Sequence, residues 1–264
     1  WRNMGGLALD LIKGAGEDFK NRQALLLKKA EDPYDGYYWI RKQILRYHMP
    51  VRIFVLASPK SKYDHGLPPN KRPYKKLIKR LKKIGPVSLH PSYASYKRPD
   101  VLEREKQVLA AFIRHEDDLK HVRRHFLKMD WPDWIHEAVA AGFSHDYSLG
   151  YAHSLGYRAG IAHSFYAFDP RTNRQLPLRI HPFALMETVF RYHRVCSAKK
   201  AWEITREMME SLSAYGGCFS SIWHDRSFAR EAEALPWKKL YKKHLKLAME
   251  LMAENQTEPR SEPK

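Results

Sequence analysis

The sequence is poor in cysteine, in long apolar runs and in acidic residues. Cys196 and Cys218 are the only cysteines among 264 residues, and no Cys-x-x-Cys spacing occurs, so a thiolate zinc site is not expected. No apolar stretch approaches the roughly 18 residues that a membrane-spanning helix needs. The N-terminus also lacks the basic segment followed by an apolar one that a secretory signal peptide requires. These absences predict two free thiols in a reducing compartment and no integral membrane segment.

Acidic residues are scarce relative to basic ones. Lys and Arg number 47 against 29 Asp and Glu, which gives a formal charge of +18. The excess is concentrated in 60–83, where Asp64 is the one acid, and in 238–246. Such an excess indicates an anionic partner: a nucleic acid, an acidic glycan or the inner membrane surface. Because neither zinc-finger spacing nor an RNP-like aromatic motif accompanies it, a nucleic acid is the least favoured partner. The alternative is that both stretches are solvated helix faces.

The pattern of apolar residues predicts an α/β fold. Apolar residues make up 44% of the chain and aromatic residues 12%, which is enough for a packed core. Short apolar runs predict strands over 52–58, 87–90, 121–127, 143–149, 157–168, 178–185 and 218–224. Apolar residues at helical spacing predict helices over 37–47, 74–84, 100–112, 133–142, 198–215 and 236–254. The alternation predicts parallel strands with right-handed crossovers in one domain over 1–254, followed by a disordered tail over 255–264.

Polar residues stand where four of the predicted strands end. They are His90, His125, Asp146 and His224. In parallel β/α folds, ligands bind outside the carboxyl ends of the strands, so these side chains are expected at one site. Histidine there suits a metal ligand or a general acid or base. Because the chain has 14 histidines, the alternative for any single one is a hydrogen-bonded or solvated residue.

Five segments carry a resemblance to a known family: SLHPSYASY, VLEREKQVL, RRHFLK, GFSHDYSLGYAHSLGYRAG and FSSIWHD. In this order and spacing they resemble bacterial polysaccharide deacetylase-like proteins of the NodB-like superfamily of carbohydrate esterases. The resemblance implies a distorted (β/α)7 barrel. It also implies hydrolysis of N- or O-acetyl groups on a bacterial polysaccharide. The implied cofactor is a divalent metal, zinc or a similar ion, held by one Asp and two His.

Residue by residue, the resemblance implies a partial site. His90 matches the first metal histidine, and Ala94 stands where the second is expected, so His125 is the candidate substitute. Arg123 matches the arginine that orients the general base, and His224 matches the histidine that protonates the leaving group. The metal aspartate and the base belong to a first barrel strand. Since the sequence begins with tryptophan rather than methionine, we expect that strand upstream, and the barrel here to be truncated at its N-terminus.

Further residues are candidates for binding the glycan. Arg158 suits a sugar carboxylate or hydroxyl, with a structural salt bridge as the alternative. Asp146 suits a partner that orients His125 or His224, with a turn-forming role as the alternative. Aromatic side chains that could stack on sugar rings, or else pack in the core, are Tyr93, Tyr147, Tyr151 and Trp223. His153 departs from the family pattern, which prefers Asp at that position.

Two other functions stay open at this point. Ala94 and the missing first strand favour a degenerate barrel that binds a glycan without hydrolysing it. The charge alone favours a basic nucleic-acid-binding protein, which would lose affinity steeply as salt rises. For the deacetylase, an acetylated glycan is the expected partner and the bacterial cytoplasm the expected location.

Overall fold

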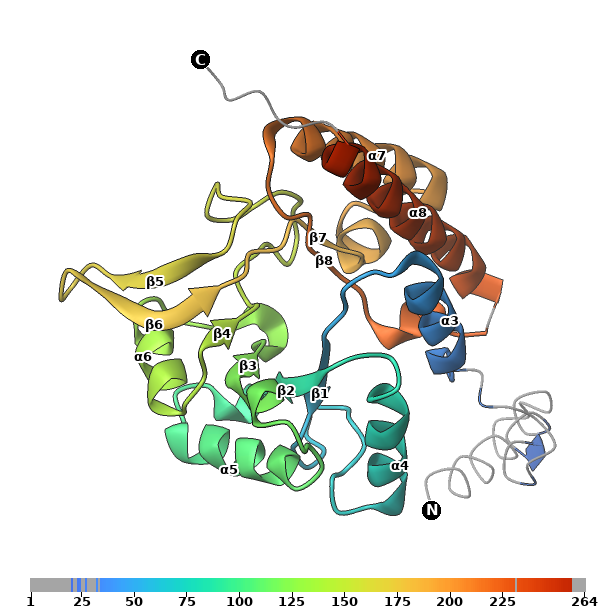
Figure 1. Cartoon of the computed structure of the whole chain (residues 1–264). Helices are drawn as coiled ribbons and strands as arrows, with labels where there is room; N and C mark the ends of the chain where they lie inside the picture. Colours follow the sequence, from blue (N-terminus) through green and yellow to red (C-terminus); the bar gives the residue numbers. More distant parts are fainter. Residues whose placement is uncertain are drawn as a thin grey trace.

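A mostly parallel sheet organises the molecule (Figure 1). We use a computed structural model, which describes residues 20, 23, 24, 27, 32, 34–230 and 232–257. The six strands of the main sheet stand in the order β1-β2-β3-β4-β6-β5. They are β1 (Ile53–Leu56), β2 (Val87–His90), β3 (His121–Val122), β4 (His145–Asp146), β5 (Phe165–Asp169) and β6 (Arg174–Ile180). A separate parallel pair joins β7 (Leu185–Met186) to β8 (Ser221–Ile222).

The sheet is open in the described part of the chain. There β1 pairs with β2 alone, and β8 pairs with β7 alone. The predicted α/β class and parallel pairing of β1 to β4 and β6 are therefore confirmed, whereas closure into a (β/α)7 barrel is not. The prediction of parallel strands is wrong for β5, which runs antiparallel to β6. The single-domain interpretation stays a prediction, and its first 19 residues lie outside the described ranges.

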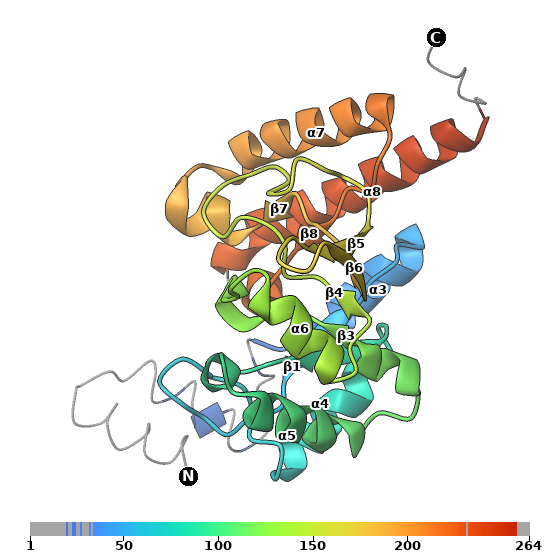
Figure 2. The same cartoon turned by 90° about the vertical axis from the view of Figure 1, so that its left-hand side faces the viewer.

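Helices cover the strands on two sides (Figure 2). On one side lie α4 (Arg72–Leu81), α5 (Pro99–Ala110) and α6 (Asp133–Ala140); on the other lie α3 (Tyr37–Tyr47), α7 (Ala198–Tyr215) and α8 (Leu235–Thr257). The core against α4 to α6 is built from strand side chains that point to one face, such as Leu89, Val122 and Ile180, all fully buried. None of the helices in the described ranges is both long and apolar enough to span a bilayer.

Strand alternation gives the opposite face of the sheet a polar character. Successive side chains of a strand point to opposite faces, so Val87 and Leu89 enter the core while Ser88 and His90 face away from it. A cavity of about 980 Å³ lies on this polar side. Its wall includes Arg52 and Arg123 from the sheet side. The topology thus places Arg52, Arg123 and His181 on the wall of one cavity.

Several predicted boundaries differ from the structure. Helices 37–47 and 198–215 are confirmed to the residue. Most predicted strands are confirmed as shorter elements, because ends such as 123–127 leave the sheet. The strand predicted over 178–185 is instead divided between β6, which begins earlier at Arg174, and β7, which begins at Leu185. The helix predicted over 100–112 is α5, which begins at Pro99 and ends at Ala110. The helix α8 extends to Thr257, so 255–257 belong to it and 258–264 lie outside the described ranges.

The two cysteines remain free thiols in the described structure. Cys196 is half-buried just before α7. Cys218 is exposed and precedes β8, so the strand predicted over 218–224 begins at Ser221 rather than at Cys218. The backbone explains this, since Gly216 and Gly217 both adopt positive φ and turn the chain before β8 begins.

Candidate functional site

His90 ends β2, and a neighbouring strand end fixes its ring. Its Nδ1 donates a hydrogen bond to the backbone oxygen of Arg123. Because a carbonyl only accepts, the proton is on Nδ1 and the lone pair of Nε2 is left free. Burial lowers the pKa of His90 well below its ordinary value, and the charges of Arg123, His125 and His224 lower it further. His90 is therefore a neutral imidazole at pH 7.

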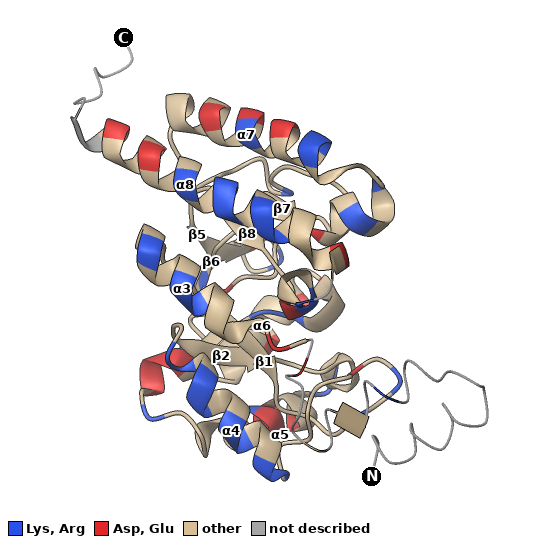
Figure 3. Ribbon diagram, turned by 90° about the vertical axis from the view of Figure 1, so that its right-hand side faces the viewer, with Lys and Arg blue, Asp and Glu red and all other residues tan. Residues whose placement is uncertain are grey.

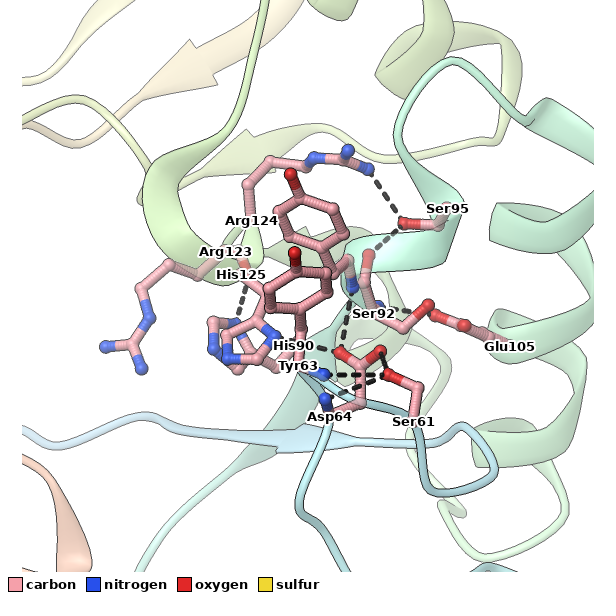
Figure 4. Close-up of polar contacts among 11 residues, drawn as sticks. Ser61, Tyr63, Asp64, His90, Ser92, Ser95, Glu105, Arg123, Arg124 and His125 are labelled. Carbon is pink, nitrogen blue, oxygen red and sulfur yellow. Dashed lines mark hydrogen bonds and ion pairs between the residues drawn. The ribbon is translucent and has the colours of Figure 1, made fainter.

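His125 is bound to a carboxylate from a distant loop (Figure 4). After β1 the chain folds so that the Ser61 hydroxyl donates to Asp64 Oδ2 at 2.6 Å. Asp64 Oδ1 accepts from the backbone N–H of Tyr93 at 2.8 Å and from His125 Nδ1 at 2.9 Å. Burial raises the pKa of Asp64, but the hydrogen bonds from Ser61, Tyr93 and His125 outweigh it and lower the pKa overall. The carboxylate is ionised and holds the Nδ1 proton of His125.

His224 has the same kind of partner on the second pair of strands. It follows β8, and its Nδ1 lies 3.0 Å from both carboxylate oxygens of Glu187, which follows β7. Glu187 is fully buried and also accepts from the His224 backbone N–H and the Ser227 hydroxyl. Burial raises the pKa of Glu187, yet its hydrogen bonds and the charge of His224 lower it overall. A second ionised carboxylate therefore orients a second imidazole.

Two of the three imidazoles lie side by side. The rings of His90 and His125 have centroids 4.8 Å apart. The charge of His224 also lowers the pKa of both. Burial lowers the pKa of Arg123 to about 10, while Glu187 raises it. The guanidinium of Arg123 lies 5.0 Å from the ring centre of Phe54 on the cavity wall.

The arrangement is suited to proton transfer beside a fixed positive charge. Each of the three imidazoles has Nδ1 held by an oxygen acceptor, which leaves Nε2 to accept or donate a proton. A desolvated guanidinium stabilises negative charge that develops nearby. The electrostatics therefore fit a reaction that passes through an anionic intermediate.

A metal ion would find an incomplete set of donors. His90 and His125 offer two Nε2 atoms, and imidazoles held by a carboxylate or a carbonyl are typical metal ligands. Both oxygens of Asp64 are already engaged by Ser61, Tyr93 and His125. Among the described residues, no group of three or more His, Cys, Asp or Glu is placed to hold a metal ion. These residues thus do not fit the three-ligand site that the resemblance implies.

An aromatic wall flanks His125. The Tyr63 and Tyr93 rings lie 4.2 Å apart, and Phe126 meets each of them edge-on. Phe126 has φ 57° and ψ 13°, a left-handed conformation that is costly for a bulky residue. Phe126 is 59% exposed, and its ring centre lies 4.5 Å from that of His125. We name Tyr63, Tyr93 and Phe126 the aromatic wall.

Asp146 does not orient either histidine, which corrects the expectation from the sequence. Its Oδ2 accepts from the Trp134 indole at 3.0 Å and from the Ser148 hydroxyl at 2.8 Å, and its Oδ1 accepts from the Ser148 N–H. Ser148 in turn accepts from the backbone N–H of Arg124. Asp146 therefore holds the turn after β4 on the core side of the sheet, the alternative role.

Other predicted binding residues are spread over the molecule. Tyr93 belongs to the aromatic wall. Trp223 lies among Phe228 and Tyr241, with ring centroids 5.8 and 4.9 Å away, so its role is mainly packing although it lines the cavity. Tyr147 also lines that cavity. Tyr151 and Arg158 are exposed in the loop after β4, where their binding roles stay predictions.

The sequence reasoning missed the two carboxylates that hold the imidazoles. Asp64 carried one signal, because it is the single acid in a strongly basic stretch. Glu187 lies two residues after the end of the apolar strand predicted over 178–185, close to the kind of position that identified the histidines. Neither signal shows which histidine the carboxylate binds, because Asp64 and His125 are 61 positions apart in the sequence and Glu187 and His224 are 37 apart.

Comparison with known proteins gives a likeness of fold. No family model and no curated protein match the sequence. A solved structure described as a "putative polysaccharide deacetylase" from Mycobacterium smegmatis superposes with a TM-score of 0.50 at 13% identity, over 98% of this chain and 90% of that one. A 4-alpha-glucanotransferase from Thermococcus litoralis gives 0.47 at 15% identity, over 82% of this chain and 33% of that one, which is too low to support an argument. The chain therefore shares the fold of the first protein, and this likeness concerns the fold alone.

Proposed function

We propose that the chain is a hydrolase that removes N- or O-acetyl groups from a glycan. The observation that carries the proposal is the pair of imidazoles, His125 and His224, that buried carboxylates orient. The charge of Arg123 acts on His125 and lowers its pKa. The likeness of fold to a protein described as a polysaccharide deacetylase supports the same reaction class. The motif resemblance in the sequence points the same way.

In this proposal the two imidazoles divide the proton transfers. Nε2 of His125 takes a proton from water as the water oxygen attacks the acetyl carbonyl carbon. Arg123 stabilises the negative charge on the carbonyl oxygen of the tetrahedral intermediate. His224, in its imidazolium form with a proton on each ring nitrogen, donates the Nε2 proton to the leaving nitrogen or oxygen as its bond to carbon breaks. The free amine or hydroxyl leaves together with acetic acid, which loses its proton to solvent as acetate. The cycle closes when His125 releases the proton that it took and His224 takes one up from solvent. Asp64 and Glu187 stabilise the imidazolium forms of their partners.

The aromatic wall would hold the sugar next to these groups. The C–H face of a sugar ring packs well against an aromatic ring, and Phe126 and Tyr63 are the wall residues with the most exposed surface. Lys128 Nζ donates to the Tyr93 hydroxyl at 2.9 Å and fixes the third ring. This supports an acetylated glycan, rather than a small acetylated metabolite, as the substrate class.

The divalent metal stays a proposal of its own. His90 and His125 are the imidazoles that would bind it, and a metal in such a site acidifies bound water. Because the described residues do not complete the ligand set, we assign the proton transfers to the chain's own groups. A second candidate, a protein that binds the glycan without hydrolysing it, is favoured by this incomplete ligand set.

Acetate release separates the two candidates. We expect the chain to release acetate from N-acetylchitotetraose or from acetylated xylan, and the His224→Ala variant to be about 100-fold slower or worse. The variant should still bind the oligosaccharide, as measured by calorimetry. Equal rates for both proteins would remove His224 from the reaction. Binding without acetate release by the unaltered chain would favour the binding-only function.

A further inference from the structure

The outward surfaces of α4, α3 and α8 form one basic face (Figure 3). The helix α3 lies between the other two. Arg41 Nε donates to the backbone oxygen of Lys83 at 3.1 Å just beyond α4. On its other side, Ile44 and Tyr47 pack in one cluster with Tyr241 and Leu245 of α8. The three helices are therefore held side by side, and we call their shared outer surface the basic face.

Exposed cations cover the basic face on all three helices. Representative pairs are Lys42 and Arg46 on α3, Lys76 and Lys79 on α4, and Lys239 and Lys242 on α8.

Carboxylates neutralise few of these charges. In the described structure, the ion pairs on the face join Arg80 to Asp35 at 2.6 Å and Lys246 to Glu250 at 3.1 Å. The face therefore carries much of the chain's net charge of +18.

Apolar side chains stand among the cations on the middle helix. Tyr38 is 70% and Leu45 54% exposed. They share one stripe of α3 with Arg41 and Lys42, because residues three, four and seven apart lie on the same side of a helix. Aromatic and aliphatic side chains flanked by Lys and Arg are the composition of helices that lie in a membrane interface.

We propose that the basic face docks on an anionic membrane surface, with the α3 stripe against the lipid headgroups. Lysines predominate on α4 and α8, and their flexible point charges fit a diffuse layer of lipid phosphates. Nucleic acids are more often bound by arginine forks, and two of the four arginines on the face, Arg41 and Arg80, are already engaged by the Lys83 backbone oxygen and by Asp35. This docking goes beyond the proposed hydrolysis and does not depend on it.

Vesicle co-sedimentation tests the proposal with the full chain. The probes are vesicles of phosphatidylcholine alone and vesicles that also contain about 30% phosphatidylglycerol. We expect binding to the anionic vesicles to be at least about tenfold tighter, and to weaken as salt is raised. The face variant carries Lys42→Glu, Lys76→Glu and Lys242→Glu, one change on each helix. We expect it to lose this preference.

The control variant carries the same change in charge elsewhere. Arg104→Glu, Arg174→Glu and Lys199→Glu alter exposed cations on α5, β6 and α7. Because both variants have the same net charge, a difference between them reports on the face itself, and circular dichroism checks that both are folded. Retained binding by the control supports the proposal. Equal binding to both vesicle types, an equal loss in both variants, or tighter binding to duplex DNA than to anionic vesicles would overturn it.

Discussion

Replacing Asp64 by asparagine removes the charge that holds His125 while keeping the shape of the side chain. In the structure the carboxylate is 1% exposed and accepts hydrogen bonds from the Ser61 hydroxyl, the Tyr93 N–H and His125 Nδ1. In the variant one oxygen can still accept from Tyr93 and His125. An NH₂ group then faces the Ser61 hydroxyl, where a carboxylate oxygen stood.

The geometry sets the size of the loss in stability. Two hydrogen bonds to a charged acceptor become bonds to a neutral one, which costs about 1 kcal/mol each. The Ser61 hydroxyl already accepts from the backbone N–H groups of Tyr63 and Asp64, so the new NH₂ group lacks an acceptor and costs about 1 kcal/mol or more. We therefore expect the free energy of unfolding of Asp64→Asn to fall by about 3 kcal/mol at pH 7.

The pH dependence has a defined sign. The pKa of Asp64 is lowered in the folded chain, so its contribution is present above the unfolded pKa of about 4 and is lost as pH falls through the folded pKa. The difference in unfolding free energy between the unaltered chain and Asp64→Asn should therefore shrink below about pH 4. Urea denaturation at a series of pH values measures it.

Activity should fall as well, because His125 loses the acceptor that orients it. Loss of such a partner typically lowers a rate by about 10- to 100-fold. The matched control is Asp169→Asn. Asp169 is also fully buried and bound to a histidine, His136 at 2.8 Å, but it lies at the far end of β5. The control should lose stability and keep its rate of acetate release. Unchanged activity in Asp64→Asn, or equal losses in both variants, would refute the role given to the Asp64–His125 pair.

Three further predictions concern the aromatic wall, two buried histidines on the polar side of the sheet, and metal binding. Phe126→Ala should weaken N-acetylchitotetraose binding about tenfold by calorimetry, whereas Phe168→Ala on an exposed part of β5 should not; equal effects would contradict the wall. Burial and neighbouring histidines lower the pKa of His121 and of His181 to about 4. The free energy of unfolding should therefore fall as pH drops from about 6.5 to about 4. A free energy of unfolding that does not change over this pH range would contradict the burial of the two histidines. Because the described donors do not complete a ligand set, equilibrium dialysis should show no zinc binding that depends on His90; stoichiometric zinc binding that His90→Ala abolishes would contradict the assignment of Nε2 of His125 to proton transfer.

Local sequence patterns predicted most of the regular elements. Both Tyr37–Tyr47 and Ala198–Tyr215 have apolar residues at helical spacing, and Ser197 caps the second through its hydroxyl. The alternation of predicted strands and helices gave the wrong direction for β5, because a tight turn reverses the chain between β5 and β6. Pro170 and Asn173 signal a turn between β5 and β6, and Asn173 has φ 52°. With that signal included, the antiparallel pairing of β5 follows from the sequence.

The sequence predicted the imidazoles of the candidate site but not the carboxylates that hold them. Strand ends placed His90, His125 and His224, because a strand end is a local feature of the sequence. The acceptors of His125 and His224 come from other parts of the chain, so only the folded structure shows them. The same holds for Phe126, whose left-handed backbone conformation no local pattern indicated.

The protonation of the imidazoles tests the central claim most directly. Heteronuclear NMR of the folded chain distinguishes a proton on Nδ1 from a proton on Nε2. We predict that His90, His125 and His224 each carry the proton on Nδ1, held by Arg123 O, Asp64 and Glu187. The ring-nitrogen resonances of His125 should shift in Asp64→Asn and stay unchanged in Asp169→Asn. A proton on Nε2 of His125 with none on its Nδ1 would contradict the account, because Nε2 of His125 could not then accept a proton from water.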